Sequence, residues 1–377
     1  MAATAPENVQ FHLIVSYLKT TVCDRIFGFG PLQALLDMPN VSEIMVVSPS
    51  LIYIEQNGKV VKTGASFLGD AELLAVLERI VAPLGRRIDR SSPLVDARLP
   101  DGSRVNAVIP PLALKGPCLT IRRFPAEAIT AEHLLRWGSL TPEALELVRG
   151  LVRGRKSIIV AGGTGSGKTT MLNVISGFID DRERLITIED SAELQLQHEH
   201  LVSLETRPEN VEGKGAVTIR DLIKNALRMR PDRIIVGECR GAEAFDMLQA
   251  MNTGHNGSMT TVHANSPAEV ITRVEAMCLM AVDIPLASLR QQIAQAIDYV
   301  IYLERLGNGQ RMTTAIAEVG DVDPQNGKIF IRTIMKANFH PEDGRYYLEH
   351  NGYIPAALPE LAAKGLVDVS KVYPHGQ

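Results

Sequence analysis

The segment AGGTGSGKTT, residues 161–170, constrains this chain of 377 residues more than any other part of its sequence. It follows an apolar run of strand length at 157–162 and precedes the helical pattern MLNVISGFI. Its spacing satisfies GxxxxGK[ST]. A glycine-rich turn without a ligand is the alternative, but the strand–loop–helix context favours a P-loop. The pattern therefore predicts a site for a nucleoside triphosphate, with ATP expected.

Each residue type in this loop has a chemical reason. Glycines let backbone N–H groups curve round a phosphate without Cβ clashes, and the next helix adds the positive end of its dipole. We expect Lys168 to reach the β- and γ-phosphates and the Thr169 hydroxyl to bind Mg²⁺. The predicted nucleotide-binding residues of the loop are Gly162, Gly163, Thr164, Gly165, Ser166, Gly167, Lys168, Thr169 and Thr170.

Charge and composition narrow the possible partners. The formal net charge is −4, so the bulk electrostatics do not favour nucleic acid or anionic lipid. The four cysteines are scattered, without a CxxC pair, which argues against a zinc site or a disulfide framework. No apolar run reaches the length of a membrane span, and the N-terminus lacks a signal-peptide pattern. We therefore expect a cytoplasmic protein that meets a membrane only through partners, and no direct nucleic-acid binding.

The hydrophobic pattern divides the chain in two. Helical periodicity over 10–37, short β-rich runs at 41–47, 51–55 and 59–61, a helix over 70–82 and strands near 103–109 and 118–124 indicate a small α+β domain. From residue 156, apolar runs alternate with helices, at 157–162, 184–190, 232–238, 258–264 and 298–304, which is typical of an α/β sheet covered on both faces. We predict an N-terminal domain over 1–124, a linker over 125–142 and an ATPase domain over 143–377 with a C-terminal helical and β extension, from whose sequence little can be read.

Acidic residues follow two of the predicted strands. A P-loop enzyme needs a carboxylate that orders Mg²⁺ and a group that polarises the attacking water, and both belong at the carboxyl ends of parallel strands. Glu238 ends the run at 232–238, Glu189 and Asp190 end the run at 184–190, and Glu193 lies one turn further on. A solvated loop or a helix cap is the ordinary explanation for any one of them. Their pairing with a P-loop predicts catalytic roles for Glu189, Glu193 and Glu238, with Glu189 and Glu238 joining Thr169 as metal ligands.

One histidine and several arginines complete the candidates. His263 ends a third strand and is predicted to sense the γ-phosphate, although a core or surface histidine is the ordinary alternative. A triphosphate is strongly anionic, so guanidinium groups are expected around it. Spacing alone does not select among the arginines, most of which would ordinarily be surface residues: Arg98, Arg104, Arg122, Arg123, Arg220, Arg228, Arg230, Arg233 and Arg240.

Together these segments resemble the secretion ATPase superfamily of type II and type IV secretion systems. That family has a Walker A motif, an acidic "Asp box", an atypical Walker B motif ending in GE and a "His box", in this order. Here they read GGTGSGKTT at 162–170, ITIEDSAEL at 186–194, RIIVGECR at 233–240 and GHNGSMTTVHA at 254–264. The segments at 27–46, 96–111 and 230–267 look like the Tad/Flp pilus assembly (CpaF-like) branch. Conjugative-transfer ATPases are close relatives within the superfamily.

The resemblance implies a RecA-like P-loop ATPase domain preceded by a smaller α+β (PAS-like) N-terminal domain, assembled as a homo-hexamer. It implies an inner-membrane platform protein as partner, and a position at the inner face of the cytoplasmic membrane. Carried over residue by residue, it gives Glu189 and Glu193 as the Asp-box acids, Glu238 as the Walker B acid and His263 as the His-box histidine. Arg240 follows the Walker B strand, and the N-terminal domain presents arginines to the phosphates: Arg98, Arg104, Arg122 and Arg123.

Two departures from the family pattern matter. The tetracysteine zinc module of type II secretion ATPases is absent, and the N-terminus is short for a CpaF-like protein. We expect an ATP hydrolase whose nucleotide cycle closes and reopens the N-terminal domain, and so drives assembly or retraction of a Tad-type pilus. A conjugation ATPase is the alternative within the family. Outside it, a nucleotide-gated scaffold would not need the acidic residues, and a nucleic-acid motor would need a basic channel.

Overall fold

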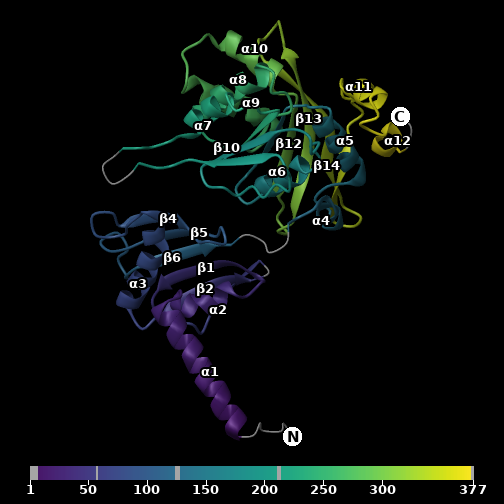
Figure 1. The fold of residues 1–377 in the computed structure, drawn as a ribbon. Helices are drawn as coiled ribbons and strands as arrows, with labels where there is room; N and C mark the ends of the chain where they lie inside the picture. Colours follow the sequence, from purple (N-terminus) through teal and green to yellow (C-terminus); the bar gives the residue numbers. More distant parts are fainter. Residues whose placement is uncertain (1–6, 57, 124–127, 210–213, 375–377) are drawn as a thin grey trace. The chain divides into compact units, whose positions relative to one another are not determined.

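The computed structural model describes residues 7–56, 58–123, 128–209 and 214–374 (Figure 1). The chain forms two compact units, Met1–Glu127 and Ala128–Gln377. Among the helices of the described ranges, none is both long and apolar enough to cross a bilayer.

The first unit is built on an antiparallel sheet of six strands in the order β3-β2-β1-β6-β5-β4. Burial alternates along its strands, so one face packs on a core and the other does not. The buried face packs against α3, as the helical period of residues 70–81 predicts. The elements are α1 (Glu7–Ile26), η1 (Gly30–Leu32), α2 (Gln33–Leu36), β1 (Val41–Ser48), β2 (Leu51–Gln56), β3 (Lys59–Lys62), α3 (Asp70–Val81), η2 (Ala82–Leu84), β4 (Leu94–Arg98), β5 (Arg104–Val108) and β6 (Cys118–Arg122).

The second unit holds a nine-stranded sheet in the order β15-β14-β13-β12-β7-β11-β10-β8-β9. The strands from β12 to β9 are parallel, whereas β13, β14 and β15 add antiparallel hairpins to the β12 edge. The strands are β7 (Ile158–Gly162), β8 (Leu185–Glu189), β9 (Leu201–Glu205), β10 (Arg233–Cys239), β11 (Met259–His263), β12 (Tyr299–Arg305), β13 (Arg311–Val322), β14 (Ile329–His340) and β15 (Arg345–His350).

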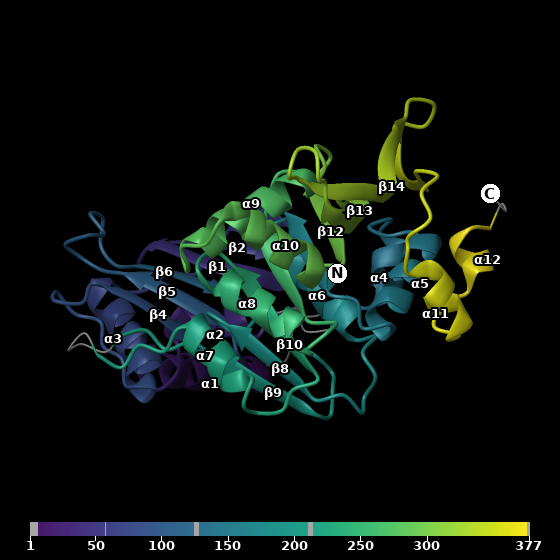
Figure 2. The same cartoon turned by 90° about the horizontal axis from the view of Figure 1, so that it is seen from above.

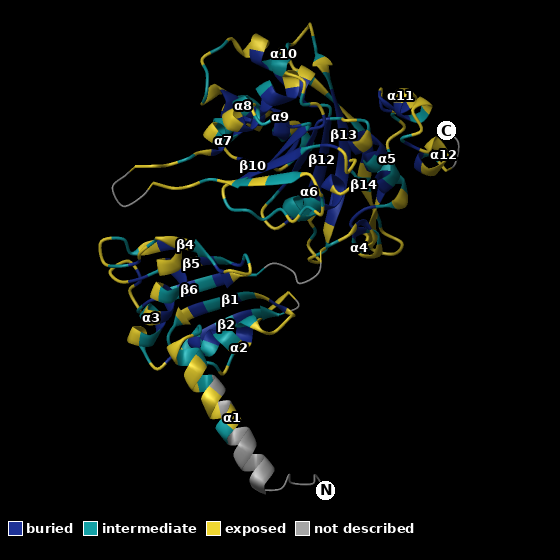
Figure 3. Cartoon of the chain, viewed as in Figure 1, coloured by how far each residue is buried: buried dark blue, intermediate teal, exposed yellow. Residues whose placement is uncertain are grey.

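Helices cover both faces of the parallel strands (Figures 1 and 2). Because both faces are covered, the central strands are buried along their whole length, which explains their continuous apolar sequence (Figure 3). One layer contains α4 (Ala131–Arg136), α5 (Pro142–Arg153), α6 (Lys168–Ser176), α11 (Leu358–Ala363) and α12 (Val369–Val372). The other contains α7 (Ile219–Ala226), α8 (Glu243–Asn252), α9 (Pro267–Leu279) and α10 (Leu286–Ala296).

The structure adds elements that the sequence pattern did not supply. The strands β4 and β9 were not predicted, and the C-terminal region with little sequence signal forms three antiparallel strands and two short helices. Ala131, Leu134 and Leu140 lie in the stretch 125–142 that the sequence suggests as a linker, yet they are buried in the core of the second unit. The C-terminal segment packs against α5, where the Cβ of an alanine at Gly154 would lie 2.2 Å from Leu361 Cδ2.

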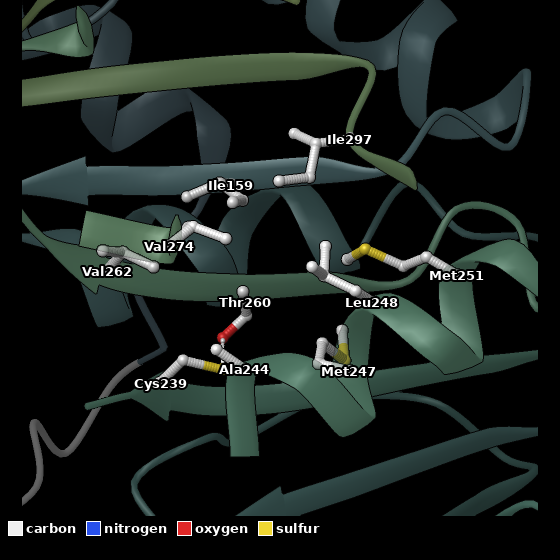
Figure 4. A pocket seen from close by; sticks show the side chains of 10 residues that line it. All are labelled: Ile159, Cys239, Ala244, Met247, Leu248, Met251, Thr260, Val262, Val274 and Ile297. Carbon is white, nitrogen blue, oxygen red and sulfur yellow. Dashed lines mark hydrogen bonds between the residues drawn. The ribbon is translucent and has the colours of Figure 1, made fainter. Parts of the chain in front are cut away.

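The packing of α8 and α9 against the sheet predicts the reactivity of two thiols, Cys239 on β10 and Cys278 on α9. Burial raises the pKa of Cys239 and of Cys278 to about 12, so both stay protonated at neutral pH. Cys239 lines an apolar void of about 10 Å³, too small for a reagent, together with Ile159, Ala244, Met247, Leu248, Met251, Thr260, Val262, Val274 and Ile297 (Figure 4).

We therefore expect Cys239 and Cys278 to react with a thiol reagent only after unfolding, whereas Cys23 is exposed and should react in the native protein. Peptide mapping after brief alkylation at neutral pH, with and without denaturant, measures this. Rapid native labelling of Cys239 would contradict the packing described here.

Candidate nucleotide site

The loop between β7 and α6 has the backbone of a phosphate cradle. Gly162 and Gly165 have φ angles of 153° and 70°, which favour glycine. A Cβ on Gly162 would lie 2.2 Å from Leu303 O and 2.6 Å from Ser166 Oγ, so no larger residue fits beside β12. The Ser166 hydroxyl is buried and donates to Gly163 O at 2.9 Å. These contacts fold the loop tightly over the start of α6.

Lys168 folds back across this loop. Its Nζ donates to Gly162 O at 3.1 Å and to Gly163 O at 2.9 Å. Burial lowers the pKa of Lys168; the charge of Glu238 opposes that effect and the charge of Arg240 adds to it. A phosphate beside Nζ would favour the charged form of the lysine. Lys168 is therefore placed and tuned to gain most when an anion enters the loop.

Parallel register brings the predicted residues of the later strands to the same edge of the sheet. His263, at the end of β11, pairs with Gly162 of β7. Glu238 lies near the end of β10, the next strand, and its charge acts on Lys168. The side chain of Glu238 is 26% exposed, and its Oε2 accepts a hydrogen bond of 2.6 Å from Arg240 Nη2. Within the described ranges, no donor contacts Glu238 Oε1, so this atom can accept from water.

Glu189, at the end of β8, has a different environment. It is 4% exposed, and its Oε1 accepts from the backbone N–H of Glu193 at 2.9 Å and of Leu194 at 3.1 Å. A Cβ on Gly237 would lie 2.7 Å from Glu189 Cγ, so the glycine of the GE pair makes room for this carboxylate. Glu189 thus shapes the loop that carries Glu193, whereas the carboxylate of Glu238 is more open to solvent.

The structure shows which of the arginines around β10 lie near the P-loop, a choice that their spacing in the sequence does not allow. The side chain of Arg240 is 69% exposed, and its pKa is raised, first by the hydrogen bond that it donates to Glu238 and then by the charges of Glu238, Asp190 and Glu193. Arg233 begins β10, at the opposite end of that strand, and is fully buried. Arg220 forms an ion pair with Asp246. Of the three, Arg240 is the one at the edge where the P-loop lies.

In the first unit, three of the predicted arginines form a row. Arg98 pairs with Arg104, and Arg104 with Arg122, in the register of β4, β5 and β6, so the three lie on one face of that sheet. Arg123 lies outside this row, because its guanidinium donates to the carbonyl oxygens of Met38 and Val41. That these arginines reach the phosphates stays a prediction.

Sequence reasoning missed one residue that contacts the P-loop. Arg311, the first residue of β13, donates from Nε to Gly165 O at 2.9 Å. It stands far along the chain in a region with no recognisable motif, so nothing in the sequence could have indicated it. Its place follows from the antiparallel hairpin that β12 and β13 form beside β7.

The sequence model of the family described as "Type II/IV secretion system protein" matches residues 27–328. The chain belongs to this family. With its P-loop, it is a secretion-type ATPase and binds nucleotide, which confirms the family and the activity predicted from the four boxes.

Curated relatives match over most of their length. A Mycobacterium tuberculosis protein assigned provisionally to conjugal transfer is 37% identical over 320 residues, 83% of this chain and 90% of its own. The type IV secretion system protein PtlH of Bordetella pertussis is 37% identical over 315 residues, 76% of this chain and 92% of its own. The conjugal transfer protein TrbB of Rhizobium radiobacter is 35% identical over 288 residues, which are 74% of this chain and 84% of TrbB.

Solved structures bear on the fold. The ATPase DotB of Legionella pneumophila superimposes with a TM-score of 0.56 at 22% identity, covering 80% of this chain and 82% of that one. The pilus retraction motor PilT with bound ADP gives a TM-score of 0.54 at 18% identity, covering 89% and 85%. This likeness confirms the predicted fold class, an N-terminal domain followed by a RecA-like ATPase domain.

Proposed function

We propose that this ATPase is a hexameric motor that uses ATP and Mg²⁺ to do mechanical work on a membrane-embedded platform protein of a pilus or secretion system. The observation that carries the proposal is the convergence of the P-loop, Glu238 and His263 at the carboxyl edge of one parallel sheet. A protein that only binds nucleotide does not need an accessible carboxylate there.

The residues at this edge fit the chemistry of triphosphate hydrolysis. The backbone of residues 162–170 and Lys168 would hold the β- and γ-phosphates. Thr169, Glu189 and Glu238 offer the hard oxygen ligands that Mg²⁺ prefers, and the ion would neutralise charge on the phosphates. Glu238 would orient and deprotonate the attacking water through Oε1, while Arg240 holds Oε2. His263 would contact the γ-phosphate, and Glu193 would act from the loop that Glu189 shapes.

The proposal also names the transport system that the motor serves. The segments at 27–46, 96–111 and 230–267 favour assembly or retraction of a Tad-type pilus, with the motor at the cytoplasmic face of the inner membrane. A conjugation or type IV secretion ATPase is the second candidate, because TrbB and PtlH, at 35% and 37% identity, carry those names. In both cases the motor would act on a platform protein, and it would not need to bind nucleic acid directly.

A gene deletion in the organism that carries this chain separates the candidates. We expect the number of surface pili to fall if the motor assembles them and to rise if it only retracts them, and to return to normal with the wild-type gene but not with Lys168→Ala. Pilus number is measured by electron microscopy, and plasmid transfer and protein export are assayed in the same strains. Loss of transfer or export with normal pili would select the second candidate. A strain unchanged in all three assays would contradict both.

A further inference from the structure

Arg311 connects the P-loop to the β12–β13 hairpin, whose strand β12 pairs with β7. Its Nε–H donates to Gly165 O at 2.9 Å, and its Cδ lies 3.6 Å from the place that a Cβ on Gly167 would take. The side chain therefore runs along the glycine-rich part of the loop. In the register of the hairpin, Arg311 pairs with Arg305 of β12.

The backbone of Arg311 is fixed by the loop between α4 and α5. Its carbonyl oxygen accepts from Ser139 Oγ at 2.6 Å, and Thr313 N–H donates to Ser139 O at 2.9 Å. The side-chain amide of Gln310 donates to Trp137 O at 3.1 Å. Three contacts thus hold the start of β13 in place, so the guanidinium is presented to Gly165 from a rigid support.

The hydrogen bond sets the direction of one peptide group. In a trans peptide the C=O and the N–H point in opposite directions, so holding Gly165 O turns the Ser166 N–H away from Arg311. That N–H points toward Gly163 O, at a long distance of 3.4 Å. Lys168 Nζ donates to the same oxygen at 2.9 Å. The Ser166 N–H and the lysine ammonium therefore converge on one oxygen of the loop, Gly163 O, and we expect the phosphate to bind on this side.

Without Arg311 the Gly165–Ser166 peptide group itself would keep only the long Ser166 N–H bond to Gly163 O, at 3.4 Å. Gly165 has a φ of 70° and no atom within 4 Å of a Cβ position, so neither sterics nor packing prevents the peptide from turning. A turned peptide would point a carbonyl oxygen at the phosphate in place of an N–H. Restoring the productive orientation would then cost part of the binding free energy.

We propose that Arg311 is a positioning residue that holds the Gly165–Ser166 peptide in the orientation that binds phosphate, before the nucleotide arrives. The inference rests on the proposed phosphate site at the P-loop. It assigns a role in nucleotide affinity to the first residue of β13, which touches the loop from outside the four sequence boxes.

The test compares Arg311→Ala with Arg305→Ala in the full chain. Arg305 is the exposed cross-strand partner of Arg311, so its removal deletes the same charge on the same hairpin, and the described structure gives it no bond to the P-loop. We expect calorimetry to show ADP and ATP binding about tenfold weaker in Arg311→Ala and within about twofold of wild type in Arg305→Ala. Turnover at saturating ATP should stay within about twofold in both, because the loss is one of uniform binding.

Two further measurements separate positioning from charge and from general damage. Hydrogen exchange of the Ser166 amide in the nucleotide-free protein should be faster in Arg311→Ala than in Arg305→Ala. The melting temperature without nucleotide should change equally little in both. Equal loss of affinity in the two variants, unchanged affinity in Arg311→Ala, or a melting temperature that falls in Arg311→Ala alone would each overturn the inference.

Lys168→Ala separates this inference from the proposed site. Loss of nucleotide binding in Lys168→Ala together with wild-type affinity in Arg311→Ala would overturn the role of Arg311 and leave the site intact. Wild-type affinity in Lys168→Ala would overturn the site itself.

Discussion

Replacing Glu238 by glutamine should leave ATP bound and reduce its hydrolysis by about 100-fold or more, the usual contribution of a general base. The amide keeps the shape of the side chain and can still contact Arg240, but it cannot accept a proton from water. Glu238 is also partly exposed, whereas Glu189 is buried and accepts hydrogen bonds from two backbone amides. Steady-state phosphate release and the affinity for ATP, measured on the same preparation, check the prediction.

Glu304→Gln is the matched control. Glu304 lies on β12, next to β7, and is also partly exposed, so the variant makes the same chemical change near the end of a neighbouring strand. We expect its turnover to stay within about twofold of wild type. Equal turnover in Glu238→Gln and wild type would remove Glu238 from the mechanism. A loss of ATP affinity that accounts for the whole defect would assign Glu238 to binding or metal ligation.

Replacing Arg233 by methionine should lower the free energy of unfolding by about 3–5 kcal/mol, the cost of breaking a buried ion pair. Arg233 is fully buried and makes a two-pronged contact with Glu183, from Nε at 2.8 Å and from Nη2 at 2.7 Å. Its Nη1 also donates to Val152 O at 2.8 Å. Methionine fills part of the space, but it leaves the largely buried Glu183 carboxylate with Arg155 as its remaining cation and Val152 O with the backbone N–H of Arg155. Urea unfolding monitored by circular dichroism measures the change.

Arg182→Met is the control on the surface. Arg182 pairs with Asp180 at 2.7 Å, but its side chain is 89% exposed, so solvent screens the pair and its loss should have little effect. The double variant Arg233→Met/Glu183→Leu should recover much of the stability lost in Arg233→Met, since the buried carboxylate is then removed together with its buried partner. A single variant as stable as Arg182→Met would show that this network does not hold the sheet together.

The ion pairs of Glu183 also make the free energy of unfolding depend on pH at the acidic end. Burial alone would raise the pKa of Glu183, but the hydrogen bonds and charges of Arg233 and Arg155 outweigh it and lower the pKa. A carboxylate whose pKa is lower in the folded state stabilises the fold above its unfolded pKa, and this contribution is lost as the pH falls through the folded pKa. Wild type should therefore lose more stability than Arg233→Met on acidification below the ordinary range of glutamate.

Local sequence predicts the parts of the candidate site whose residues are adjacent in the chain. A P-loop is a strand, a glycine-rich turn and a helix in direct succession, so residues 162–170 could be predicted as phosphate-binding without a fold. The same holds for the acids that end the buried runs at 184–190 and 232–238, because parallel strands between helices place their carboxyl ends together. The family boxes added the order of these segments, and the sequence model over 27–328 confirms the family.

Only the tertiary structure decided what depends on contacts between distant segments. Glu189 and Glu238 look equivalent in sequence, but backbone amides engage the first while the second is partly exposed. Arg233 and Arg240 stand seven positions apart and lie at opposite ends of one strand. Arg233 forms a buried ion pair with Glu183, whereas Arg240 pairs with Glu238 at the edge where the P-loop lies. Arg311 has no motif at all. The physical reason is that burial, pairing and reach are set by neighbours in space, whereas the P-loop is built from neighbours in the chain.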